Sequence, residues 1–247
     1  ARCRIAGWCR GPASLYRVCF SMTADLVAGT ALLPVAALSL REVKKPRELP
    51  FALLPAIFAA HQFMEVFVWA GLDGNVPHWL AQLAMRAYLF IAWPLLPTYV
   101  PLAVMLLEPH GSRLRVAPLV GLGAVVSAYL AFVVLANPVQ VIRHPHGLEY
   151  ATVVADPLLW AVLYILAVIG APLLSGYRSV VAFGAANLIG LVLVAIFYVQ
   201  AFASLWCVFA SASSLLILVH MYRRSRLPDS DRLRGDRYGG SPIAAGR

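Results

Sequence analysis

Two ionisable side chains, Glu65 and Arg86, fall well inside long apolar stretches of this 247-residue sequence. An ionisable group inside a membrane-spanning helix costs about 2.5–3.5 kcal/mol on insertion scales, so each such residue suggests a functional site. In each stretch the residue lies roughly 10 Å from the end that faces the same side of the membrane, at a rise of about 1.5 Å per helical residue. We expect them to pair or to share a polar cavity, with Glu65 as an acid, a base or a cation site and Arg86 as the group that tunes it. The alternative is a structural ion pair that locks two helices together.

His61, Glu65 and Trp69 follow one another at intervals of four residues and therefore share one helix face. His and Glu at that spacing can bind one metal ion, and Cys19 could supply a third ligand for Zn or Cu. The alternative is a hydrogen-bonded histidine that serves helix packing. Around Glu65, we expect Gln62, Trp69 and Trp93 to line a binding pocket.

The composition indicates that these residues lie in lipid. Hydrophobic residues make up 61% of the chain, charged residues 13%, and the mean hydropathy is +0.78. Soluble domains carry roughly 25% charged residues, so this chain could not cover a water-facing surface. The fold class that follows is an all-α integral membrane protein.

A spanning helix needs about 20 mostly apolar residues, and seven stretches qualify. Pro94, Pro97 and Pro101 lie in the third, which is long enough to be split in two; we expect one kinked helix, because no polar turn interrupts it. The predicted seven-helix bundle consists of Thr23–Leu40, Pro50–Leu72, Trp79–Leu107, Val116–Ala136, Pro157–Ser175, Val180–Tyr198 and Phe202–Tyr222.

The distribution of cations predicts the orientation of the bundle. Segments 41–49, 108–115, 176–179 and 223–247 hold 14 of the 20 Lys and Arg residues, whereas the loops on the other side hold only Arg143. By the positive-inside rule the N-terminus is outside and the C-terminus cytoplasmic, in a multi-pass protein of the cell membrane. The net charge of +9 then needs no nucleic-acid partner. It orients the protein, and anionic lipid is the expected partner at the cytoplasmic face.

The two ends of the chain differ from the predicted transmembrane domain, 18–222. Residues 1–17 carry four arginines on the side that should have few, and we interpret them as a non-native or disordered leader, with Val18 as a start codon read as Met. Residues 223–247 are predicted to be a basic, disordered cytoplasmic tail. Cys19 and Cys207 map to the outer side, where a disulfide between them could persist.

The segment Val18-Cys19-Phe20-Ser21-Met22-Thr23-Ala24 resembles the Met-Cys-(Phe/Trp)-Ser-Ala opening of an uncharacterised bacterial family, mainly actinobacterial, of small multi-span membrane proteins. The resemblance continues through 46–50 and through His61, Gln62, Glu65 and Trp69, and it covers roughly 18–72 well. It implies the multi-span architecture and no particular activity. Members of that family often carry Gln in place of His61, which argues against an obligatory metal ligand there.

Several function classes are excluded or lack their motifs. A retinal protein needs a lysine in its last helix, and the only lysines are Lys44 and Lys45, so no retinal is expected. Phosphate-binding glycine loops, zinc-protease motifs and the nucleophile elbow do not occur. No repeat suggests an inverted-repeat transporter.

Two functions remain in competition. The first is a small membrane-embedded enzyme or ligand-binding protein, with Glu65 as a buried acid acting on a lipophilic molecule, by analogy with membrane-bound terpene cyclases of similar size. The second is a transporter or sensor, with Glu65 as a proton or cation site. An enzyme would show a closed apolar pocket at Glu65, and a transporter a polar path leading past it to the cytoplasm.

Overall fold

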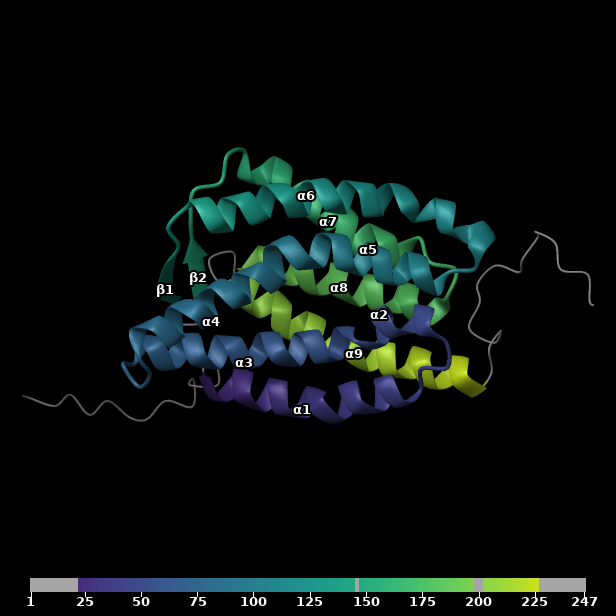
Figure 1. The fold of residues 1–247 in the computed structure, drawn as a ribbon, viewed down its shortest axis with the longest axis horizontal. Coiled ribbons are helices and arrows are strands. Elements are labelled where there is room, and N and C mark those ends of the chain that lie inside the picture. The colour runs from purple at the N-terminus through teal and green to yellow at the C-terminus, as the bar shows by residue number, and fades with distance from the viewer. Residues whose placement is uncertain (1–21, 145–146, 198–201, 227–247) are drawn as a thin grey trace, which may run out of the picture.

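The computed structural model describes residues 22–144, 147–197 and 202–226, which form long, packed helices and one β-hairpin (Figure 1). Single long helices are α1 (Met22–Arg41), α3 (Leu54–Leu72), α6 (Ala117–Ala136), α7 (Pro157–Leu173), α8 (Arg178–Phe197) and α9 (Phe202–Arg226). The remaining long helix consists of α4 (His78–Phe90), the π-helical segment η2 (Ile91–Leu95) and α5 (Leu96–Leu107). Short elements are η1 (Pro46–Glu48), α2 (Leu49–Ala52) and η3 (His110–Arg115).

The described helices have the length and apolar composition of membrane-spanning helices. Five segments are long and apolar enough to cross a membrane: Met22–Arg41, Pro46–Leu72, His78–Leu107, Ala117–Ala136 and Arg178–Ile196. The shorter apolar helix Pro157–Leu173 and helix α9 occupy the other two predicted positions. The described helices therefore lie where the hydropathy pattern predicts them.

The third long helix is continuous from His78 to Leu107, as expected, and its irregularity is local. Pro94 lies inside the π-helical segment η2, where the missing backbone donor disturbs the hydrogen-bond ladder. The hydroxyl of Tyr164 on α7 donates to the carbonyl oxygen of Ala92 at 2.5 Å, so a neighbouring helix satisfies an acceptor in this segment. The prolines thus modify one helix and do not divide it.

The helices close into a ring. α1 packs on α3, α3 on α4, α5 on α6, α6 on α7, α7 on α8 and α8 on α9, and α9 returns to α1. Contacts of α3 with α9 and of α5 with α7 fill the interior. The largest hydrophobic core cluster includes Phe51, Phe58, Leu107, Phe183 and Ile217, and so draws on helices from both halves of the chain.

A β-hairpin covers one end of the bundle, in the segment 137–156 that connects the fourth and fifth predicted spans. Strands β1 (Gln140–His144) and β2 (Gly147–Ala151) pair in antiparallel fashion, with Val141 opposite Tyr150. Leu148 and Tyr150 are buried against α3 and α4. Figure 1 shows the hairpin at the end where α3 passes into α4, opposite the end of α9. We call these the hairpin end and the basic end.

Candidate functional site

The face of α3 that carries the predicted site residues is buried inside the bundle. His61 is 1% exposed, and Gln62 and Glu65 are 0% exposed, while Trp69 is also buried. Helix periodicity predicts this result, because residues three and four apart share one face. Together with Asp25, Tyr88 and Tyr150 these residues form what we call the polar cluster.

Glu65 contacts the hairpin through Tyr150. The Tyr150 hydroxyl donates to Oε1 of Glu65 at 3.4 Å. The Tyr150 ring stacks on that of Tyr88 with centroids 4.5 Å apart, and Tyr88 stacks on His61 at 3.9 Å. A column of three rings from β2, α4 and α3 therefore lies beside the carboxyl group, and it fixes where Tyr150 presents its hydroxyl.

A second buried carboxyl group, Asp25 of α1, belongs to the same cluster. Asp25 is 1% exposed, and its Oδ2 accepts a hydrogen bond from the Trp69 indole nitrogen at 2.9 Å. The guanidinium of Arg143 lies 5.1 Å from the centre of the Trp69 ring and pairs with Asp73 at 2.6 Å. Contacts thus run from an exposed ion pair at the hairpin end down to Asp25.

Arg86 does not join Glu65. It is exposed on α4, and none of the ion pairs between described residues connects the two. The prediction that they pair compared only how deep each residue lies in its helix. It did not consider which face of the helix each side chain occupies. Helix α4 buries Met85, Tyr88 and Leu89, and Arg86 lies on the opposite face. Tyr88 is the α4 residue that reaches the site.

The other predicted site residues are placed as follows. Trp93 is half-buried in η2 and packs against the cluster that contains Trp69 and Tyr88. Cys19 lies outside the described residues, as does the side chain of Cys207, so the metal site and the disulfide remain predictions. Within the described part of the chain, no group of three or more His, Cys, Asp or Glu side chains is arranged to hold a metal ion.

Polar contacts continue from the cluster along α9. The amide nitrogen of Gln62 donates to Ser211 at 3.4 Å, and Asn187 of α8 donates to Ser213 at 2.9 Å. Asn187 also lines an apolar cavity of about 20 Å³ that begins one helical turn from Gln62. The cavity is lined by Phe58, Leu96, Val100, Val168, Pro172, Phe183, Gly184, Asn187 and Ala210.

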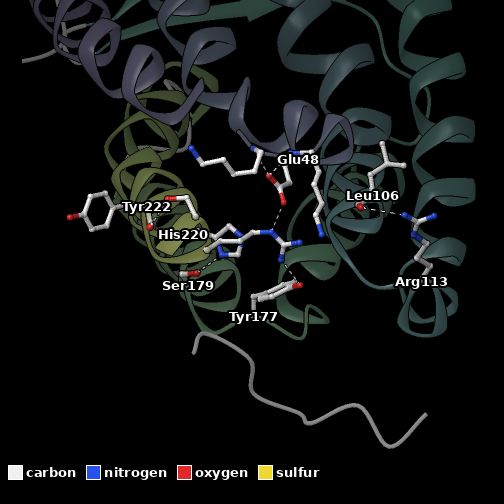
Figure 2. Close-up of polar contacts among 11 residues, drawn as sticks. Glu48, Leu106, Arg113, Tyr177, Ser179, His220 and Tyr222 are labelled. Atoms are coloured by element: carbon white, nitrogen blue, oxygen red, sulfur yellow. Dashed lines mark hydrogen bonds and ion pairs between the residues drawn. The ribbon is translucent and has the colours of Figure 1, made fainter. Parts of the chain in front are cut away.

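The basic end contains a separate polar network, shown in Figure 2. Arg224 of α9 donates from Nε to Glu48 at 2.8 Å and from Nη1 to the Tyr177 hydroxyl at 2.5 Å. His220 Nδ1 lies 2.7 Å from the Ser179 hydroxyl. Burial by itself would lower the pKa of Arg224, but the bonds to Glu48 and Tyr177 outweigh it and hold the pKa above its ordinary value. Arg224 therefore joins three segments as a permanent cation.

Sequence reasoning missed Tyr88, Tyr150 and this network. Tyr88 could have been found from the buried face of α4, which repeats at three and four residues. Tyr150 comes from a hairpin whose strands carry only a weak alternating pattern. Glu48 gave a signal of its own, because it is an acidic residue among Lys44, Lys45 and Arg47 at a helix end.

Comparison with known proteins gives one match. Residues 18–232, most of the chain, match the model of a family described as "Family of unknown function (DUF6629)". No curated protein and no solved structure matches this chain.

Proposed function

This chain belongs to that family of unknown function, and from the polar cluster we propose that it binds a lipophilic small molecule at a buried acid, Glu65. The observation that carries the proposal is the position of Glu65. Its side chain is completely enclosed within helices and hairpin, and a phenol and stacked aromatic rings surround it. Such an environment suits an apolar ligand with one polar contact.

The surrounding groups support acid chemistry at Glu65. A carboxyl group in this position can donate a hydrogen bond or a proton to a ligand. The Tyr150 hydroxyl, which already donates to Oε1, would then stabilise the carboxylate that remains. Trp69 and Trp93 belong to the same packed cluster and would contact an apolar ligand. An enzyme using Glu65 as the acid, or a binding protein using it as the polar anchor, would need this arrangement.

Native mass spectrometry with elemental analysis tests the proposal on the purified full-length protein. We compare wild type with Glu65→Gln, which keeps the shape of the side chain and removes the acid. Asp156→Asn is the matched control, because Asp156 is exposed and its left-handed backbone is one that Asn tolerates. A co-purifying lipophile in wild type and the control, depleted in Glu65→Gln, is the expected result.

Two other results would contradict it. A metal ion near one per chain that is lost with Glu65→Gln would favour the Cys19–His61–Glu65 metal site. No bound molecule in any of the proteins would leave Glu65 with a role in helix packing.

A transporter or sensor is the second candidate, because polar groups continue beyond Gln62. Ser211, Ser213 and Ser214 are buried on α9, but the fully buried Ile217 separates them from His220. This apolar layer favours a binding protein over a proton path in the arrangement described. Proton uptake by proteoliposomes that is abolished by Glu65→Gln would support the transporter instead.

Orientation and surroundings complete the proposal. We propose a seven-span protein of a bacterial cell membrane, with the basic end in the cytoplasm and anionic lipid against it. The support comes from Lys44, Lys45 and Arg47 beside η1 and from Arg223 and Arg226 at the end of α9.

A further inference from the structure

Two buried acceptor atoms of the polar cluster lack a donor among the described residues. Oδ1 of Asp25 and Oε1 of Gln62 are buried, and within the described part of the chain neither receives a hydrogen bond. An amide oxygen never donates, and a carboxylate only accepts. A buried polar atom without a partner costs about 1–3 kcal/mol, so native proteins seldom leave one unless a bound group completes it.

The packing of α1 on α3 places these acceptors near Glu65. Asp25 contacts Trp69, and one turn along α1 a side chain at Gly29 would meet Gln62 at 3.3 Å. The two helices are therefore antiparallel, and the two contacts bracket Glu65. Asp25 and Gln62 consequently face the interface between α1 and α3, and Glu65 lies on α3 between these two contacts, one turn from Gln62.

The ring nitrogens of His61 belong to the same cluster. Both are buried, neither has a side-chain hydrogen-bond partner among the described residues, and the ring itself stacks on Tyr88. A neutral imidazole supplies one further acceptor. Two carboxyl groups, an amide oxygen and an imidazole, next to aromatic rings, match the needs of a positively charged donor.

We infer that the polar cluster binds a small lipophilic primary amine as its ammonium ion, a class of ligand that deepens the proposed function and rests on it. The three N–H donors of an ammonium group match Asp25, Gln62 and Glu65. The apolar tail would point toward the cavity that begins at Phe58 and Ala210. That cavity holds about 20 Å³, so the side chains that line it must move apart to admit an alkyl tail.

Binding of n-hexylamine tests the inference, measured by calorimetry on the full-length protein in nanodiscs with empty nanodiscs subtracted. The neutral isostere n-hexanol is the comparison ligand, and the primary test needs no variant. We expect hexylamine to bind wild type at least about tenfold more tightly than hexanol, because an ion pair out of water is worth 1.4 kcal/mol or more. Asp25→Asn and Gln62→Leu should remove most of that difference, and Asp156→Asn should keep it.

The outcomes separate this inference from the proposed function. Equal binding of hexanol and hexylamine would overturn the ammonium ligand and leave a lipophile site at Glu65. Displacement of hexylamine by an equal concentration of sodium chloride would also overturn it, because a sodium ion alone would then satisfy the acceptors of the polar cluster. Binding of neither ligand would contradict both.

Discussion

At the scale of single residues, Arg224 shows how one side chain can hold distant segments together. Its guanidinium bonds Glu48 beside α2 and Tyr177 before α8, and it lies 5.1 Å from the centre of the Tyr177 ring. Glu48 in turn accepts bonds from the backbone nitrogens of Lys44 and Lys45. The charged groups are almost completely enclosed, so each depends on the other.

Arg224→Met should therefore destabilise the protein strongly. Removing one partner of a buried ion pair costs about 3–5 kcal/mol, because the remaining charge loses its compensation. Arg224→Lys keeps the charge but loses the forked geometry, and should cost about 1–2 kcal/mol. Reversible unfolding in mixed micelles measures both.

Arg226→Met is the matched control, because Arg226 is half exposed and its nitrogen lies 3.7 Å from Glu42. It should leave stability within experimental error. Equal losses of unfolding free energy for Arg224→Met and Arg226→Met would show that burial does not strengthen the ion pair between Arg224 and Glu48.

The residues of the site were partly predictable. The spacing of His61, Glu65 and Trp69 was enough to place them on one buried face. Arg86, predicted as the partner of Glu65, is exposed on the other face of α4, because depth in a helix does not say which way a side chain points. Tyr150 could not be found, since its contact with Glu65 joins residues 85 positions apart and depends on a tertiary fold.

At the scale of elements, helices α5 and α6 meet at Gly123. A Cβ atom there would overlap the carbonyl oxygen of Pro97. Pro101 has no N–H, so the Pro97 oxygen lacks its usual helical donor and can be approached closely by another backbone. One turn along, Thr98 donates to Ser127 at 2.8 Å. Proline and glycine together thus allow two helices to approach closely.

Gly123→Ala should lower stability by about 1–3 kcal/mol, since the backbones must separate to admit one methyl group. Gly121→Ala on the same helix is the control, because a Cβ there meets nothing within 4 Å. It should be neutral or slightly stabilising, as alanine favours helix by up to about 1 kcal/mol. Thermal unfolding in detergent compares the two, and equal midpoints would contradict the close approach.

The hairpin is held by buried rings and by one exposed ion pair. Arg143→Ala removes the bond to Asp73 and the contact with Trp69. Because exposed pairs contribute at most about 1 kcal/mol, amide exchange in 147–151 should speed up by no more than about fivefold. Hydrogen–deuterium exchange measures this.

Tyr150→Phe supplies the comparison for the hairpin, because it removes the hydroxyl and keeps the ring stack on Tyr88. Exchange in 147–151 should rise less than it does for Arg143→Ala if ring packing holds the strand. A larger rise for Tyr150→Phe would assign the main role to the bond with Glu65.

The long helices were predicted closely, because uninterrupted apolar runs of about 20 residues have few alternatives. The predicted Ala136 boundary is the observed one, and α9 runs to Arg226, four residues beyond the predicted Tyr222. The hairpin was not predicted, because its residues are shared between a buried face and water and carry no strong apolar run.

At the scale of the whole molecule, the number of helices and the distribution of cations predict a membrane topology that fusion proteins can test. With seven spans and a cytoplasmic C-terminus, a fluorescent protein fused after Arg247 should fold and fluoresce. Alkaline phosphatase fused after Val154 should be active, because that segment would face the periplasm. Active phosphatase at the C-terminus would contradict the seven-span topology.

The closure of the ring by α9 also bears on how the protein is made. Gln62 enters the membrane early in synthesis, but Ser211, which accepts its hydrogen bond, is added near the end. Until α9 inserts, the side-chain amide nitrogen of Gln62 lacks the Ser211 acceptor. Chains that stop before α9 should therefore be recognised by membrane proteases, and quality control would monitor completion of the last helix through a group on the second.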